Sequence, residues 1–120
     1  MTLSPFPASP SDTAADRAAW LKAAGGLNAA IDAGRLSSPV TLSLVEALLL
    51  GLMRQGVTKF LAIFGHGSTA LADVIKVYEA EGLVRCWQFR NEVEMAHAGT
   101  ALSWVYGEIG AVVTSIGPGA

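Results

Sequence analysis

The stretch TKFLAIFGHGSTALADVIKVYEAEGLVRCWQF, residues 58–89, contains the alternation that decides the fold. An apolar run, TKFLAIF, precedes the short loop GHGS and the segment TALADVIKVYEAEG, which has a helical composition and ends at a glycine. VRCWQF is then typical of a second strand. Strand, helix and strand in this order favour a right-handed crossover between parallel strands.

The same alternation continues on both sides of this stretch. NEVEMAHAGTALSWVYG predicts a further helix, and IGAVVTSI, rich in β-branched residues, predicts a third strand. On the other side, residues 41–56 predict a helix in which Ser43 and Glu46 have capping-box spacing and Gly56 is the stop. This helix is apolar on more than one face, so we expect it in the interior or at a subunit interface. The predicted fold class is α/β, with a parallel sheet flanked by helices.

The first forty residues differ in composition from the rest of the chain. Residues 1–13 are rich in Ser, Pro and Thr, and we expect them to be flexible. Residues 14–34 are rich in Ala and predict one helix, or two short helices broken at Gly25 and Gly26. The sequence therefore predicts a flexible and helical extension over residues 1–40 and a main domain over residues 41–120.

Composition narrows the classes of protein. A chain of 120 residues with 52% hydrophobic and 15% charged residues is one globular domain or part of one. A net charge of −2 with scattered Lys and Arg gives no electrostatic case for binding nucleic acid. No apolar run approaches the ~20 residues of a membrane-spanning helix, and no signal-peptide pattern is present. The single cysteine, Cys86, excludes an internal disulfide and fits a reducing compartment, so we expect a cytoplasmic protein.

Each of the three predicted strands is followed by a loop whose residues could bind a ligand or take part in a reaction. They are GHGS (residues 65–68), RNE (residues 90–92) and SIGPGA (residues 115–120). Ligands of parallel α/β sheets bind outside the carboxyl ends of the strands, so we expect these loops to be neighbours.

Each loop is a weak signal when taken alone. GHGS is an ordinary strand-to-helix turn or an anion-binding loop, and it is neither a Walker loop nor a complete GxGxxG motif. Glu92 in the first helical turn favourably complements the helix dipole. The two histidines, His66 and His97, lack the spacing of metal ligands, and no GxSxG motif supports a serine nucleophile.

Taken as a set, the motifs resemble the pyrimidine-binding domain of thiamine-diphosphate enzymes of the acetolactate synthase and pyruvate decarboxylase superfamily. The shared pattern is Arg90-Asn91-Glu92 after a strand, then Ala96-His97-Ala98 in a helix, then the loop from Thr114 to Ala120. The resemblance covers residues 41–120.

Within that superfamily, three departures look like the trihydroxycyclohexanedione hydrolases of inositol catabolism, which cleave a ring C–C bond in a cyclic diketone. They are Asn91 where His is usual, the additional Ile116, and GHGS where many relatives carry Gly-x-Pro-Gly. Val93-Glu94 departs from the Gln-Gly expected in both groups.

The resemblance implies roles for individual residues. Glu92 would hydrogen-bond N1′ of the cofactor's aminopyrimidine and favour the 4′-imino tautomer, which removes the C2 proton. Met95, Ala96 and Ala98 would give this carboxyl group an apolar pocket, while Glu94 and His97 would only support the helix. The loop near the pyrimidine would be Gly117, Pro118 and Gly119, and the substrate side would be formed by His66, Gly67 and Ser68.

The resemblance also implies a larger enzyme. Members of the superfamily bind the diphosphate and Mg²⁺ through a separate domain with a Gly-Asp-Gly…Asn motif, which this sequence does not contain. We therefore expect the N-terminal part of a longer enzyme that is inactive by itself. The whole enzyme would act on a small-molecule carbonyl substrate as a homodimer or homotetramer.

Several alternatives remain open on the residues alone. The reaction is hydrolysis of a cyclic 1,2-diketone, an acetolactate synthase-like ligation, or decarboxylation or lysis of a 2-keto acid. A different class of protein would be a nucleotide-binding or flavodoxin-like module that uses GHGS as an anion loop. That module would leave Glu92 without a role. A third class is a non-catalytic, interaction-only relative with the same fold, which would not need a buried Glu92.

Overall fold

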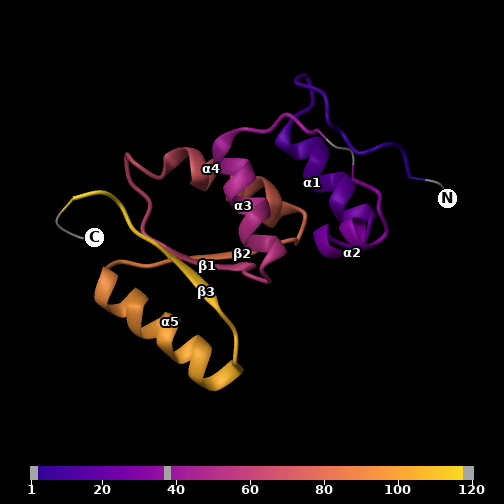
Figure 1. The fold of residues 1–120 in the computed structure, drawn as a ribbon. Coiled ribbons are helices and arrows are strands. Elements are labelled where there is room, and N and C mark those ends of the chain that lie inside the picture. Colours follow the sequence, from indigo (N-terminus) through magenta and orange to yellow (C-terminus); the bar gives the residue numbers. More distant parts are fainter. Residues whose placement is uncertain (1–2, 37–38, 118–120) are drawn as a thin grey trace.

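The computed structural model describes residues 3–36 and 39–117 and contains one parallel sheet of three strands (Figure 1). The strand order is β2-β1-β3, so the first strand lies in the centre. The strands are β1 (Lys59–Ala62), β2 (Arg85–Gln88) and β3 (Gly110–Val113), and the helices after the first two strands are α4 (Thr69–Ala80) and α5 (Glu92–Tyr106). The predicted α/β fold, a parallel sheet flanked by helices, is confirmed.

The helices cover both faces of the sheet. α3 (Leu44–Arg54) and α4 lie over one face, and α5 lies over the other (Figure 1). On the α3–α4 side, Phe60 of the central strand is buried in the main hydrophobic core. On the α5 side, Gly110 lets the sheet and the helix approach closely, because a Cβ there would lie 2.7 Å from Leu61 Cδ1 and 3.0 Å from Leu102 Cδ2.

The N-terminal segment forms a further layer over α3 and α4. It contains two helices, α1 (Ala14–Ala23) and α2 (Leu27–Asp32), so the predicted break at Gly25 and Gly26 is confirmed. Both glycines have positive φ angles, 87° and 105°, which other residues rarely adopt. α1 packs against α4, and α2 packs against α3.

The described part of residues 1–13, which we expected to be flexible, packs against α1. Phe6 is buried and meets the Trp20 ring edge to face, with ring centroids 5.1 Å apart. The indole N–H of Trp20 donates to the Ser4 carbonyl at 2.7 Å. Thr13 forms a complete capping box with Asp16 at the start of α1. One aromatic pair and one helix cap thus order a segment whose composition is typical of a loop.

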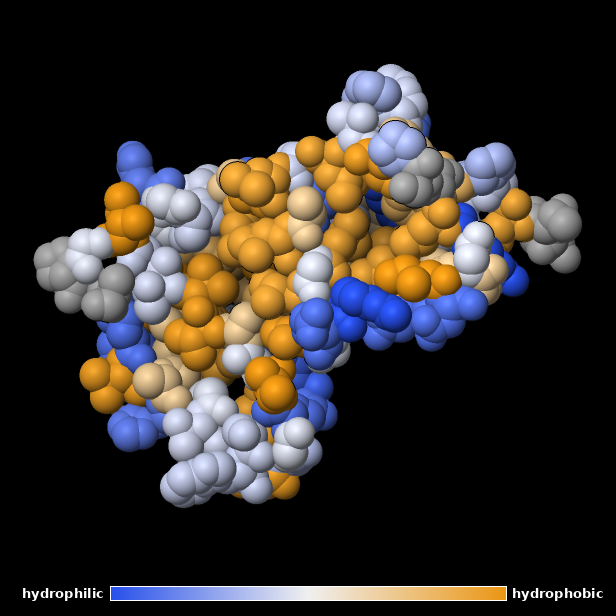
Figure 2. All heavy atoms as spheres, viewed as in Figure 1, coloured by the Kyte–Doolittle hydropathy of each residue, from blue (hydrophilic) through white to orange (hydrophobic). Residues whose placement is uncertain are grey.

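Helix α3 keeps only half of its predicted capping box. The Ser43 hydroxyl accepts from the Glu46 backbone N–H at 3.2 Å, but the Glu46 side chain turns inward instead of returning to Ser43. Leu49 is buried and Leu50 is half-buried, as an interior helix requires, whereas Leu44 and Leu48 are exposed. Figure 2 shows hydrophobic residues gathered over α3 on the face of the molecule that is turned toward the viewer. Within the two described ranges, no helix has the length and apolar character needed to cross a bilayer.

Candidate functional site

The three predicted loops lie at one end of the sheet. All three strands are parallel, so loop 65–68, the start of α5 and the segment after β3 leave from the same edge (Figure 1). Of the predicted pyrimidine loop, Gly117 is described and has a φ angle of 106°. Pro118 and Gly119 lie outside the described residues.

Loop 65–68 is a tight turn closed by its own polar groups. The Ser68 N–H donates to the Gly65 carbonyl at 2.9 Å, and the Gly65 N–H donates to the Ser68 hydroxyl at 3.1 Å. Thr69 donates its hydroxyl to the same Gly65 carbonyl at 3.0 Å. Ser68 is only 9% exposed, while His66 and Gly67 are exposed. Of the residues predicted on the substrate side, His66 therefore faces solvent, whereas Ser68 stabilises the turn through its hydrogen bonds to Gly65.

The internal bonding of this turn bears on its ability to hold an anion. A phosphate-binding loop offers several backbone N–H groups to its ligand. In loop 65–68 the N–H groups of Gly65 and Ser68 are already used within the turn. An anion would have fewer donors here than the sequence GHGS suggests.

Loop 65–68 packs directly against the segment after β3. A Cβ on Gly65 would lie 2.7 Å from the Cβ of Ser115, and one on Gly67 would lie 2.6 Å from Cγ2 of Ile116. Real Cβ atoms do not approach this closely, so both glycines are needed for loop-to-loop packing. The sequence predicted that the loops are neighbours, but it offered only a strand-to-helix turn or the approach of a ligand as the reason for these glycines. Nothing in the local sequence around Ser115 and Ile116 predicts that they contact these two glycines.

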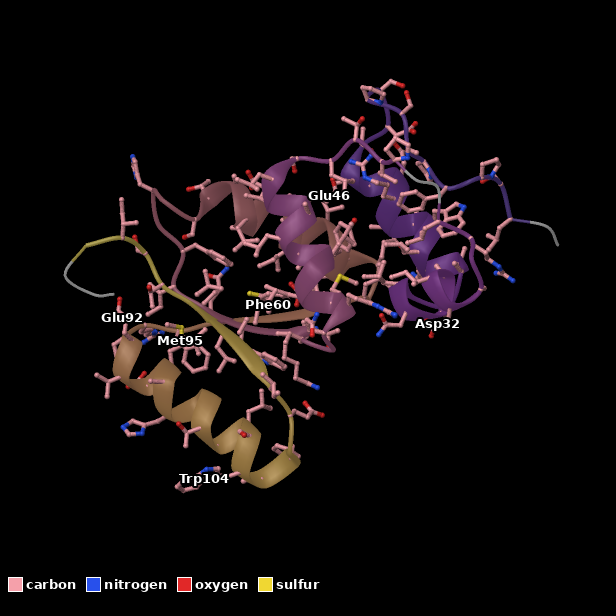
Figure 3. The ribbon with its side chains drawn as sticks, viewed as in Figure 1. Asp32, Glu46, Phe60, Glu92, Met95 and Trp104 are labelled. Atoms are coloured by element: carbon pink, nitrogen blue, oxygen red, sulfur yellow. The ribbon has the colours of Figure 1, made fainter. Side chains whose placement is uncertain are left out.

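Glu92 is the first residue of α5. Asn91 caps the helix by accepting from the Glu94 N–H through its side-chain oxygen at 2.8 Å. This gives Asn91 a structural role that the sequence analysis missed, although Asn followed by Glu at the third position is a standard cap signal. Glu92 itself is half-buried, and its carboxylate makes no hydrogen bond to another described residue. Its side chain lies at the end of α5 that is next to the edge where the three strands end (Figure 3).

The three residues expected to give Glu92 an apolar pocket differ in burial. Met95 is fully buried against the sheet, but Ala96 is exposed and Ala98 is half-buried. Glu94 and His97 are both exposed on the outer side of the helix. Of the residues near Glu92 that the sequence singled out, only Met95 is enclosed. No group of three or more His, Cys, Asp or Glu side chains in the described ranges is placed to hold a metal ion.

α5 and the adjoining edge of the sheet expose several large apolar side chains among polar ones. Trp104 is 85% exposed, and it points away from the sheet (Figure 3). The other exposed large apolar residues of this surface are Val93, Val105, Tyr106, Ile109, Val112 and Ile116. Several exposed large apolar side chains on one surface are typical of an interaction site. We call this surface the α5 face.

A groove between α4 and β2 holds Cys86. It is lined by Phe64 at the end of β1, by Asp73 and Lys76 of α4, and by Gln88 at the end of β2. Burial and the nearby Glu79 carboxylate raise the pKa of the Cys86 thiol. Cys86 packs against the hydrophobic core, and a thiol with a raised pKa is a weak nucleophile, so both observations favour a packing role.

Comparison with known proteins adds no assignment to this geometry. No protein-family model, no curated protein and no solved structure matches the chain significantly.

Proposed function

We propose that this chain forms the first part of a thiamine-diphosphate pyrimidine-binding domain. The observation that supports this most is the position of Glu92, at the first turn of α5 and at the edge where the three strands end. An acid there, half-buried and without a hydrogen-bond partner among the described residues, is available to a ligand. The edge itself is the place where parallel α/β sheets bind ligands.

In this proposal the chain's residues bind and orient the aminopyrimidine. Glu92 would hydrogen-bond the ring nitrogen N1′, Gly117, Pro118 and Gly119 would line the ring, and His66 would reach the substrate side. When bound, the cofactor supplies the carbanion chemistry of the reaction. The diphosphate and Mg²⁺ would be held by another domain of the enzyme.

The reaction we propose makes or breaks a C–C bond next to a carbonyl. The exposed imidazole of His66 can hydrogen-bond a hydroxyl or carbonyl group, which fits hydrolysis of a polyhydroxylated cyclic 1,2-diketone. An acetolactate synthase-like ligation or a 2-keto acid decarboxylation is the alternative within the same class. A nucleotide-binding module is less favoured, because loop 65–68 uses two of its N–H groups internally.

The proposed enzyme is a homodimer or homotetramer. The α5 face supports this, because it exposes more large apolar side chains than a free surface needs. Further parts of the enzyme, from the same subunit or from another copy, would cover it.

The test compares two carboxylates of one helical turn in the assembled enzyme that contains this sequence. Glu92→Gln removes the acid at the ligand edge, and Glu94→Gln makes the same change on the exposed side of α5. We expect Glu92→Gln to slow H/D exchange at C2 of bound thiamine diphosphate by roughly two to four orders of magnitude, the range of a positioned acid–base group. Glu94→Gln should leave the exchange rate nearly unchanged. Equal exchange in the two variants would refute the role of Glu92.

A further inference from the structure

A buried ionic network joins the N-terminal segment to the main domain. Arg17 of α1 donates from Nε to Glu46 Oε1 and from Nη2 to Glu46 Oε2, both at 2.7 Å. The Tyr78 hydroxyl of α4 donates to Glu46 Oε1 at 2.8 Å. Arg17 is 4% exposed and Glu46 is 1% exposed. Figure 3 shows Glu46 at the top of α3, beside α1.

The network makes α1 a required partner of α3 and α4. A carboxylate that is removed from water is strongly destabilising unless a cation and hydrogen bonds compensate for its lost hydration. Both oxygens of Glu46 are satisfied, and the cation comes from a helix 29 residues earlier in the chain. The third nitrogen of the guanidinium, Nη1, donates to the Asp12 carbonyl at 3.0 Å. Without α1, Glu46 would keep only its bond from Tyr78.

Two other ion pairs join the same layers, and both are accessible to solvent, with Glu81 half-buried and the other charged partners exposed. Lys22 of α1 lies 3.1 Å from Glu81, just after α4. Arg54 of α3 donates to Asn28 of α2 at 2.9 Å and lies 3.4 Å from Asp32. Water screens such exposed pairs, so they add little to stability. They are therefore matched controls for the buried network.

The position of Tyr78 links this network to the candidate site. Tyr78 lies on α4, which begins at Thr69 directly after loop 65–68. α4 is one uninterrupted helix of 12 residues, and a helix of that length moves as a rigid rod. Ile75 and Tyr78 are its two fully buried residues, and Leu71, Val74 and Val77 also pack against the core, so the network holds the C-terminal half of α4 at one of its most buried contacts.

We propose that residues 3–36 act as a clasp whose docking through Arg17 sets the position of α4 and of loop 65–68. The receiving surface on α3 and α4, with the Glu46 carboxylate at its centre, is built for a helix that carries an arginine. This inference is independent of the proposed cofactor and substrate.

The first test asks whether the clasp is held by Arg17. A protease site inserted into the connection between α2 and α3 is cut after the full chain has folded, and retention of the N-terminal piece is followed by gel filtration. We expect the pieces to remain associated. Arg17→Met should increase the dissociation constant at least tenfold, because Glu46 then lacks its cation. Arg54→Ala should change it less than about threefold, because its pair is exposed.

The second test asks whether docking controls the candidate site. Hydrogen exchange of the backbone amides of residues 65–72 is measured in the uncut chain. Arg17→Met should speed their exchange at least tenfold, and Arg54→Ala should not. The triple variant Arg17→Met, Glu46→Met, Tyr78→Phe replaces the network by apolar groups and should restore slow exchange.

A second variant keeps the proposal testable if the first one does not fold. If Arg17→Met does not fold, Arg17→Lys decides, since it keeps the charge but cannot make the two-pronged contact and should give intermediate values. The proposal is overturned if Arg17 and Arg54 variants release the N-terminal piece equally. It is also overturned if the amides of residues 65–72 exchange at the wild-type rate once the arginine contact is lost.

Discussion

Gly65 and Ser115 lie so close together that a methyl group on Gly65 would stand 2.7 Å from the Ser115 Cβ. The two residues are 50 positions apart and belong to the loops after β1 and β3. Their contact joins two of the three loops at the candidate site. The packing of that edge therefore depends on the absence of one side chain.

The Gly65–Ser115 contact leads to a rescue prediction. Gly65→Ala should lower the free energy of unfolding by about 1–3 kcal/mol, the usual cost of overpacking. Adding Ser115→Gly removes the obstructing atoms and should recover most of this loss, which urea denaturation will measure. Gly51→Ala is the control, because no atom lies within 4 Å of its Cβ position in α3 and alanine favours a helix. A double variant as unstable as Gly65→Ala would contradict the contact.

His66 and Ser68 should behave differently when each is replaced by alanine. Ser68 is buried and bonds twice to Gly65, so Ser68→Ala should cost about 1 kcal/mol of stability. His66 is exposed, so His66→Ala should leave stability unchanged. In the proposed enzyme it should instead shift the ratio of kcat/KM for a cyclic dione and for pyruvate by more than about tenfold, equivalent to about 1.4 kcal/mol. Cofactor affinity serves as the control, and a uniform loss with both substrates would assign the loop a structural role only.

Tyr78 should make the protein unstable in alkali. Burial, followed by the hydrogen bond to Glu46, raises the pKa of Tyr78 above its ordinary value of 10.0. The folded chain then retains a proton that the unfolded chain releases, so this stabilisation is complete below pH 10 and is lost as pH rises. The loss should be about 1.4 kcal/mol per pH unit above 10.

The measurement for Tyr78 uses Tyr106→Phe as the parent, so that only one tyrosine remains. Unfolding free energies between pH 9 and pH 11 are compared (roughly one unit either side of the ordinary tyrosine pKa) with and without Tyr78→Phe. The additional alkaline loss should vanish in the second variant. Tyrosinate absorbance that develops in the folded parent with a midpoint near 10 would disprove the shift.

The α5 face should determine self-association. Trp104 on α5 and Leu44 on α3 are almost equally exposed, at 85% and 86%, so their replacements by lysine form a matched pair. If copies of the proposed enzyme meet through the α5 face, Trp104→Lys should weaken association at least tenfold in sedimentation velocity, because a charge would enter an apolar contact. Leu44→Lys should have little effect. Weakening by Leu44→Lys alone would assign the interface to the opposite layer.

The sequence predicted the elements of the main domain well because their signals are local. Each strand, helix and glycine stop lies within a short window of hydrophobic pattern, and the break at Gly25 and Gly26 is equally local. Glu46 shows where such reasoning ends. Its spacing from Ser43 predicts a capping box, but its partner Arg17 is set by tertiary packing, which no short window records. The order of residues 3–13 depends in the same way on the meeting of Phe6 with Trp20.

The sequence predicted that the three loops leave from one edge of the sheet, but it did not predict their detailed geometry. Parallel strands place their following loops at one edge, so the neighbourhood of Gly65, Glu92 and Ser115 follows from topology. The internal bonds of Ser68 and the exposure of Ala96 depend on backbone angles and on how α5 is rotated over the sheet. Those quantities are not encoded in motif spacing.

The three tryptophans lie in three different layers of the protein, the N-terminal helices, the sheet and α5, so each reports on a different environment. Trp20 in the N-terminal clasp is 7% exposed, Trp87 in β2 is 39% exposed, and Trp104 on α5 is 85% exposed. Indole emission shifts to longer wavelength as water gains access, so the spectrum is a sum of three environments. Release of the clasp would redden the Trp20 component, and coverage of the α5 face would move the Trp104 component toward the blue. Undocking of the N-terminal clasp and assembly through the α5 face would thus shift the tryptophan emission in opposite directions. One fluorescence measurement without an added label would distinguish the two events.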